Sequence, residues 1–204
     1  MNLSEPLEGL TSLVGAAVLR VLARADTGFS GRQVHALAGV GSTSSVHRAL
    51  RNMVDVGIVT ATAQPPAIVY RVNRNHLLWS SVAFALEARP RFFEGIRRFC
   101  AEELAQELEM TVVVYGSVAR RTSTSESDVD LLVVYPDGID PEARADFDYR
   151  ITGHVQEVTG NECQVFSIER GDFDRRITDG DAFIHNVLRD GLIVVSPNDA
   201  KATP

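Results

Sequence analysis

The stretch that decides the fold of the C-terminal half runs Thr111-Val112-Val113-Val114-Tyr115-Gly116-Ser117, and after ten residues Asp128-Val129-Asp130 follows. The first run is rich in β-branched residues, which favour strands, and it ends in a Gly-Ser turn. The apolar residues 131–135 continue the second run as another strand. Because side chains alternate along a strand, Asp128 and Asp130 are predicted to share one face while Val129 points to the other.

This spacing resembles the signature of minimal nucleotidyltransferases of the DNA polymerase beta superfamily, in which ten residues separate a Gly-Ser pair from an Asp-x-Asp pair. The resemblance implies transfer of a nucleoside monophosphate from a magnesium-bound nucleoside triphosphate, expected to be ATP, to a hydroxyl group. It implies that Asp128 and Asp130 are catalytic and bind Mg²⁺, and that Gly116 and Ser117 bind the nucleotide. Arg120 and Arg121, one helical turn further on, are assigned to the phosphates from their position alone.

A third carboxylate usually completes the metal site of this family, on a later strand that should be Cys163–Ile168 here. If the register matches, Gln164 takes that place, and an amide binds metal weakly and cannot accept a proton. Glu162, two residues earlier on the same strand face, is the alternative third metal ligand. The sequence leaves open which residue occupies the third position, and with it the strength of catalysis.

The N-terminal part has a different pattern. Apolar spacing predicts helices at 13–25, 30–38 and about 43–56, with a Gly39-Val40-Gly41 turn before the third. Two β-prone runs, 58–63 and 67–72, follow as a hairpin. This succession resembles the winged helix-turn-helix family on pattern alone, which implies binding of double-stranded DNA, with protein contact as the alternative. The candidate DNA contacts are Ser44, Ser45, His47, Arg48, Arg51, Asn52, Arg71 and Arg74.

Charge and composition limit the classes of partner and the cellular location that can be expected. Residues 1–76 contain seven arginines and four acids, although the whole chain has a net charge of −7, so the basic front part is the candidate for a polyanion. The two cysteines are too few for a disulfide framework or a cysteine-based zinc site. No apolar run reaches the roughly 18 residues of a membrane span, and the first residues lack a signal-peptide pattern. We therefore expect a cytoplasmic protein that does not contact membranes.

The expected organisation is an α+β chain with three parts. Residues 1–76 form the winged helix-turn-helix domain, residues 77–109 a helical linker with an apolar ladder that includes Leu104 and Leu108, and residues 110–204 a nucleotidyltransferase domain with a mixed sheet and flanking helices. The favoured function is a regulatory, DNA-binding nucleotidyltransferase that modifies a protein or a small molecule. The alternatives are a transcription regulator with a weak, nucleotide-sensing transferase domain, and the antitoxin of a toxin-antitoxin pair. A homodimer that reads two half-sites is expected, because a single winged domain of modest charge would bind DNA weakly.

Overall fold

The computed structural model describes residues 1–103 and 110–197, and the chain divides into two compact units. Unit 2 is Glu5–Ala88, and unit 1 combines Met1–Ser4 with Arg89–Pro204. The boundary therefore lies at 88/89, within the predicted linker 77–109, and the first four residues join the C-terminal unit. Leu104 and Leu108 of the predicted apolar ladder lie outside the described residues.

The predicted linker is divided because its two helices bury apolar faces in different cores. The helix α4 (Trp79–Leu86) packs Val82, Ala85 and Leu86 against residues near the start of the chain. The helix α5 (Ala88–Glu103) instead buries Phe92 and Ile96 in the core of unit 1. Burial of each apolar face, and not helix formation, decides to which unit each half belongs.

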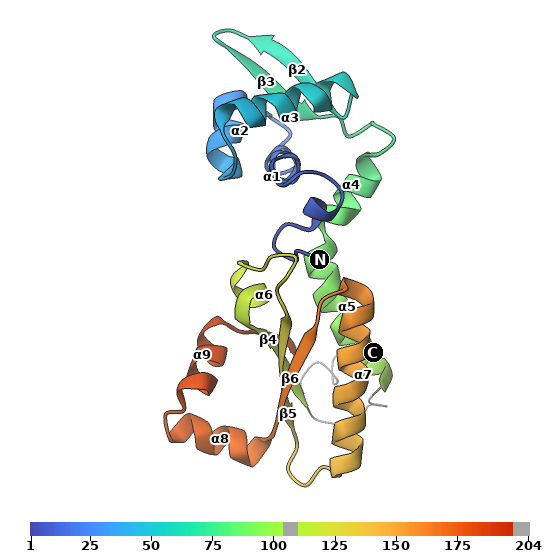
Figure 1. The fold of residues 1–204 in the computed structure, drawn as a ribbon, viewed down its shortest axis with the longest axis vertical. Helices are drawn as coiled ribbons and strands as arrows, with labels where there is room; N and C mark the ends of the chain where they lie inside the picture. The colour runs from blue at the N-terminus through green and yellow to red at the C-terminus, as the bar shows by residue number, and fades with distance from the viewer. Residues whose placement is uncertain (104–109, 198–204) are drawn as a thin grey trace. The chain divides into compact units, whose positions relative to one another are not determined.

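Unit 2 contains the helices and the hairpin expected from the sequence (Figure 1). Its elements are the 3-10 helix η1 (Pro6–Gly9), α1 (Leu13–Leu22), β1 (Phe29–Ser30), α2 (Gly31–Ala38), α3 (Thr43–Asp55), β2 (Val59–Gln64), β3 (Ala67–Val72) and α4. The side chains of Ser12, Ser30 and Ser42 accept backbone N–H groups at the starts of α1, α2 and α3. The strands form an antiparallel sheet in the order β1-β3-β2.

Unit 1 is built on a four-stranded mixed sheet. After α5 its elements are β4 (Thr111–Tyr115), α6 (Gly116–Arg120), β5 (Val129–Tyr135), α7 (Pro141–Thr159), β6 (Cys163–Glu169), α8 (Arg170–Thr178), α9 (Ala182–Asp190) and β7 (Leu192–Val195). The strand order is β6-β5-β4-β7, in which β5 and β6 are parallel and the other pairs are antiparallel. The predicted α+β class with a mixed sheet and flanking helices is confirmed for this unit.

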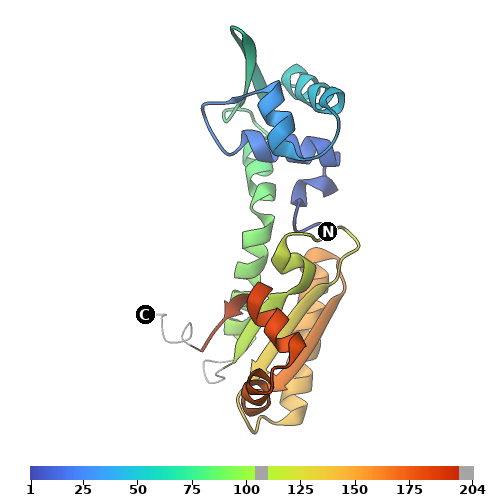
Figure 2. The same cartoon turned by 90° about the vertical axis from the view of Figure 1, so that its left-hand side faces the viewer.

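Alternation along β5 divides the sheet into two faces. Leu131, Val133 and Tyr135 enter the core that α5 and α7 cover. Leu132 and Val134 enter a second core with residues of α8 and α9. Figure 2 looks onto α8 and α9, with the sheet behind them. Asp130 has the same parity as Leu132, so its carboxylate belongs to the α8/α9 face.

No helix in the described ranges is both long enough and apolar enough to cross a lipid bilayer.

Candidate nucleotide and metal site

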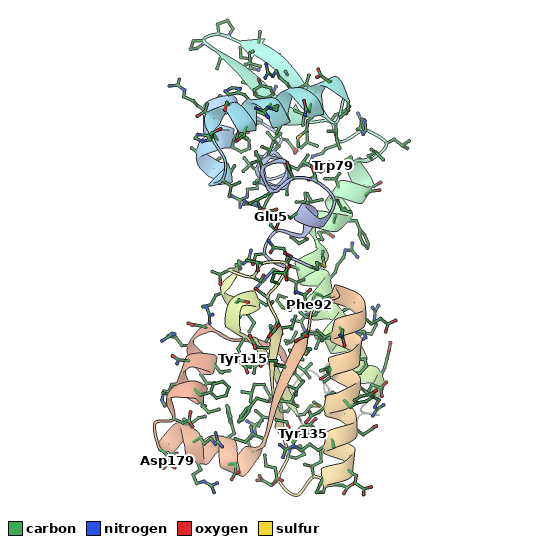
Figure 3. The ribbon with its side chains drawn as sticks, viewed as in Figure 1. Glu5, Trp79, Phe92, Tyr115, Tyr135 and Asp179 are labelled. Carbon is green, nitrogen blue, oxygen red and sulfur yellow. The ribbon has the colours of Figure 1, made fainter. Side chains whose placement is uncertain are left out.

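The register of three neighbouring strands places one residue of each strand side by side at one end of the sheet. Tyr115 of β4 lies opposite Asp130 of β5, and Gln164 of β6 lies beside Asp130 on its other side. All three have the parity of the α8/α9 face. Figure 3 labels Tyr115 on the α9 side of the sheet, whereas Tyr135, at the other end of β5, lies on the α7 side. The site is thus at the end of the sheet where α6 begins.

Position 116 requires a glycine because the carboxylate of Asp130 lies directly against it. Its φ of +69° lies in the left-handed region, and a Cβ added to it would lie 2.0 Å from Oδ2 of Asp130. The space that any other side chain would need is therefore filled by the candidate catalytic carboxylate. The family resemblance implied a nucleotide-binding role for Gly116, and the close approach of Asp130 is a second reason for glycine here.

The two carboxylates repel each other in a partly desolvated setting. Burial raises the pKa of Asp130 above its usual range, the negative charge of Asp128 raises this pKa further, and the positive charge of Arg120 partly opposes the shift. A divalent cation between the carboxylates would relieve this repulsion. Oxygen donors are the ligands that Mg²⁺ prefers, so the donor set fits the expected metal.

The structure brings Gln164 to the carboxylates. Its Nε2 donates a hydrogen bond of 2.7 Å to Oδ2 of Asp128. Glu162 precedes β6 and is exposed, and its backbone carbonyl accepts the N–H of Val129 at 2.8 Å. Within the described residues, no three His, Cys, Asp or Glu side chains are grouped as a metal site. Two carboxylates and one amide therefore form the observed cluster, without the side chain of Glu162.

Ser117, Arg120 and Arg121 lie on or directly after the short helix α6, which follows the strand β4. Ser117 is half-buried, and its backbone carbonyl accepts the N–H of Thr122 at 3.0 Å. Arg120 is exposed, and its Nη1 lies 4.0 Å from Oδ2 of Asp190. Arg121 ends the helix in the left-handed conformation, with φ of 59°. Arg120 is the arginine whose charge acts on Asp130.

Three aromatic rings that the sequence analysis did not single out lie on the same face of the sheet as Asp130. Phe183 of α9 packs edge-on against Tyr115 at 5.5 Å and against Phe166 at 5.1 Å between ring centroids. Burial, followed by the charges of Asp130 and Cys163, raises the pKa of Tyr115. Phe166 was detectable in principle, because it alternates with Gln164 on one face of β6. Phe183 was not, because its place depends on how α9 packs.

The surroundings of both cysteines disfavour the thiolate form. Burial is the largest cause that raises the pKa of Cys100 and of Cys163 to about 12 in each case. The thiolate, which is the nucleophilic and metal-binding form, is thus disfavoured at neutral pH.

The candidate DNA contacts of unit 2 fall into two groups. Three of the candidates on α3 have exposed side chains without a hydrogen-bond or ion-pair partner among the described residues: Arg48, Arg51 and Asn52. Arg71 on β3 is half-exposed. The others have internal contacts. Ser44 and Ser45 hydrogen-bond to Ser42, the N-cap of α3, and His47 packs against Gly31. Arg74 donates to Asp26 at 2.8 Å and lies over the ring of Trp79.

Comparison with known families agrees with the geometry of unit 1. Residues 94–177 match the family model described as "Nucleotidyltransferase domain". This range includes the Gly-Ser pair, the Asp-x-Asp pair and Gln164. Comparisons with curated proteins and with solved structures each give no match. Residues 94–177 are therefore similar to a nucleotidyltransferase domain.

Proposed function

We propose that unit 1 binds a magnesium-bound nucleoside triphosphate, expected to be ATP, and transfers its nucleoside monophosphate to a hydroxyl group. The proposal rests chiefly on the position of Asp130, whose carboxylate fills the space that a side chain at position 116 would need. Asp128 belongs to the same cluster, where it accepts a hydrogen bond from Gln164. A metal bound by the carboxylates would thereby lie beside the turn that starts α6. The match of residues 94–177 to the nucleotidyltransferase domain supports the same reaction class.

In this reaction a bond forms between the acceptor oxygen and the α-phosphorus of the nucleotide. The bond from that phosphorus to the β-phosphate oxygen breaks, and pyrophosphate leaves with its electron pair. Asp128 and Asp130 would hold the metal, which supplies charge neutralisation for the phosphates. The backbone at Gly116 and the hydroxyl of Ser117 would contact the triphosphate, and Arg120 and Arg121 would add positive charge.

Proton removal from the acceptor is the weak point of the chemistry. Gln164, the candidate for the third-carboxylate position, stands beside Asp130, and an amide cannot take a proton. The acceptor would therefore need a hydroxyl that ionises easily or a base of its own. A tyrosine of a partner protein meets the first condition better than a sugar hydroxyl does, because its pKa is about 10.

We further propose that unit 2 is a winged helix-turn-helix domain that binds double-stranded DNA. The order of its elements and the exposed Arg48, Arg51 and Asn52 of α3 support this assignment. Arg74 is a weaker candidate for phosphate contact, because Asp26 neutralises its charge locally. A homodimer that binds two half-sites, and a regulatory role for the whole chain, follow from the same proposal.

One observation favours a second candidate, a transcription regulator whose transferase domain senses a nucleotide without efficient transfer. Gln164 occupies the cluster and already donates a hydrogen bond to Asp128. Such a site can bind a magnesium-nucleotide while it lacks a base. An antitoxin that represses its own promoter and acts on a partner toxin combines features of both candidates.

The test is a calorimetric titration of a non-hydrolysable ATP analogue with Mg²⁺ into the wild type and into the Asp128→Asn/Asp130→Asn variant. A matched control is Asp174→Asn/Asp179→Asn, which makes the same charge change at two exposed positions, one within the helix α8 and one at its C-cap. We expect binding by the wild type and the control and none by the first variant. Transfer of radiolabel from α-labelled ATP to an acceptor in a lysate then separates the enzyme from the nucleotide sensor. Absence of wild-type binding would refute both candidates.

A further inference from the structure

Unit 2 is inserted into unit 1, so the chain passes between the units at two points, Ser4–Glu5 and Ala88–Arg89. At each point the residue on the unit 1 side contacts the same short segment. Arg89 hydrogen-bonds to Val118 and Ala119, and Ser4 hydrogen-bonds to Ser123. This segment connects the Gly-Ser pair to the Asp-x-Asp pair. Both connections of unit 2 therefore end on the part of the chain that frames the proposed nucleotide site.

Arg89 holds the C-terminal end of α6. Its Nη2 donates to the carbonyl oxygens of Val118 at 3.0 Å and of Ala119 at 3.3 Å. The last carbonyls of a helix lack partners within the helix, and a basic side chain can satisfy them. The guanidinium also lies 4.6 Å from the ring centroid of Phe93. Burial and the positive charge of Arg121 lower the pKa of Arg89, as expected for a cation held close to protein atoms.

Ser4 holds the loop that follows α6. Its Oγ lies 2.7 Å from Oγ of Ser123 and accepts the backbone N–H of Ser123 at 3.0 Å. Ser123 is 5% exposed, and the neighbouring Leu3 is 1% exposed within the core of unit 1. The contact is therefore part of the packed domain. At the far end of the loop, Nδ2 of Asn161 donates to the carbonyl of Ser127 at 2.7 Å.

We propose that Arg89 and Ser4 are positioning residues of the nucleotide site, which set the place of α6 and its following loop relative to Asp128 and Asp130. The proposal rests on the proposed function and goes beyond it, because neither residue belongs to either motif. The tight contact between Gly116 and Asp130 leaves little tolerance for movement of α6. Magnesium demands near-ideal ligand geometry, so a small displacement of α6 changes nucleotide affinity.

The experiment compares Arg89→Met, Arg89→Lys and Ser4→Ala in the full chain by calorimetry with Mg²⁺ and a non-hydrolysable ATP analogue. Arg98→Met is the matched control, because Arg98 is an exposed arginine of the same helix. We expect Arg89→Met to bind about tenfold more weakly, which corresponds to about 1.4 kcal/mol. Arg89→Lys should recover part of this loss, since it keeps a cationic donor, and Ser4→Ala should weaken binding in the same direction. Arg98→Met should bind like the wild type.

The number of nucleotide sites per chain, which calorimetry also measures, distinguishes a residue that positions α6 from one that only stabilises the fold. A residue that acts on folding alone lowers the fraction of binding-competent chains and leaves the affinity of the remaining ones unchanged. Misplacement of α6 lowers the affinity at one site per chain. Wild-type affinity in both Arg89→Met and Ser4→Ala, or a fall in site number alone, would overturn the proposal; if Arg89→Met does not fold, Arg89→Lys and Ser4→Ala decide it. Failure of the wild type itself to bind would instead refute the proposed function, and this inference with it.

Discussion

Replacement of Gly116 by alanine tests the geometry of the site most directly. A Cβ at this position would lie 2.0 Å from Oδ2 of Asp130, and ordinary contact needs at least 3.4 Å. The obstructing atom is the end of a flexible side chain, so the carboxylate is expected to rotate away by more than an ångström. Magnesium binds its ligands at about 2.0–2.1 Å with strict geometry, so a shift of this size removes Asp130 from any metal it helps to hold. We therefore expect nucleotide affinity to fall by about tenfold or more, equivalent to about 1.4 kcal/mol.

The loss of folding stability in Gly116→Ala should be no larger than for alanine at any other left-handed position. The left-handed conformation costs a residue with a Cβ about 1–2 kcal/mol. Gly138→Ala is the matched control, because Gly138 has a φ of +75° and an added Cβ would meet nothing within 4 Å. Urea unfolding should give similar losses for the two variants, while calorimetry with Mg²⁺ and an ATP analogue should give weaker binding for Gly116→Ala alone. Unchanged nucleotide affinity in Gly116→Ala would refute the argument that Asp130 in its observed position holds the metal.

Further outcomes follow from the same site and from unit 2. Burial and the charge of Asp128 raise the pKa of Asp130; an acid whose folded pKa is raised makes the fold less stable as pH rises from the unfolded pKa through the folded one. Asp130→Asn should therefore unfold at a higher temperature than the wild type at neutral pH and lose this advantage in acid, as thermal scans across pH would measure. Gln164→Glu should strengthen Mg²⁺-dependent nucleotide binding and increase transfer of radiolabel, because it adds a carboxylate beside Asp130; an unchanged affinity would argue against metal binding at this position. Arg48→Ala/Arg51→Ala should weaken binding to a mixed-sequence DNA duplex and reduce the salt slope by about 2 in fluorescence anisotropy, if each arginine neutralises one phosphate; an unchanged slope would exclude α3 from the DNA contact.

The pair of carboxylates and the Gly-Ser turn were predictable because their signals are local. Strand alternation places Asp128 and Asp130 on one face whatever the rest of the chain does, and β-branched residues before Gly116 indicate the strand β4 directly. The helices of unit 2 were predictable for the same reason, since apolar spacing and serine caps act within a few residues.

Local signals could not predict which residue of β6 lies beside Asp130. β5 and β6 are parallel, so the chain returns through the helix α7 before it pairs, and the register depends on how that helix packs. The sequence therefore allowed either Glu162 or Gln164 at the third position. The observed register pairs Asp130 with Gln164. A shift by two residues would have kept the same face of β6 and brought Glu162 beside Asp130 instead.

By itself the sequence determined the local elements, the carboxylate pair and the class of domain they indicate, because backbone preferences and side-chain alternation operate over a few residues. Only the tertiary structure decided the division of the linker, the contact of Gln164 with Asp128, and the contact of Ser4 with Ser123 across 119 residues of chain. These depend on which apolar faces are buried together, which is a property of the whole packed unit. Local pattern thus predicts which residues carry the chemistry, and long-range packing sets the distances between them.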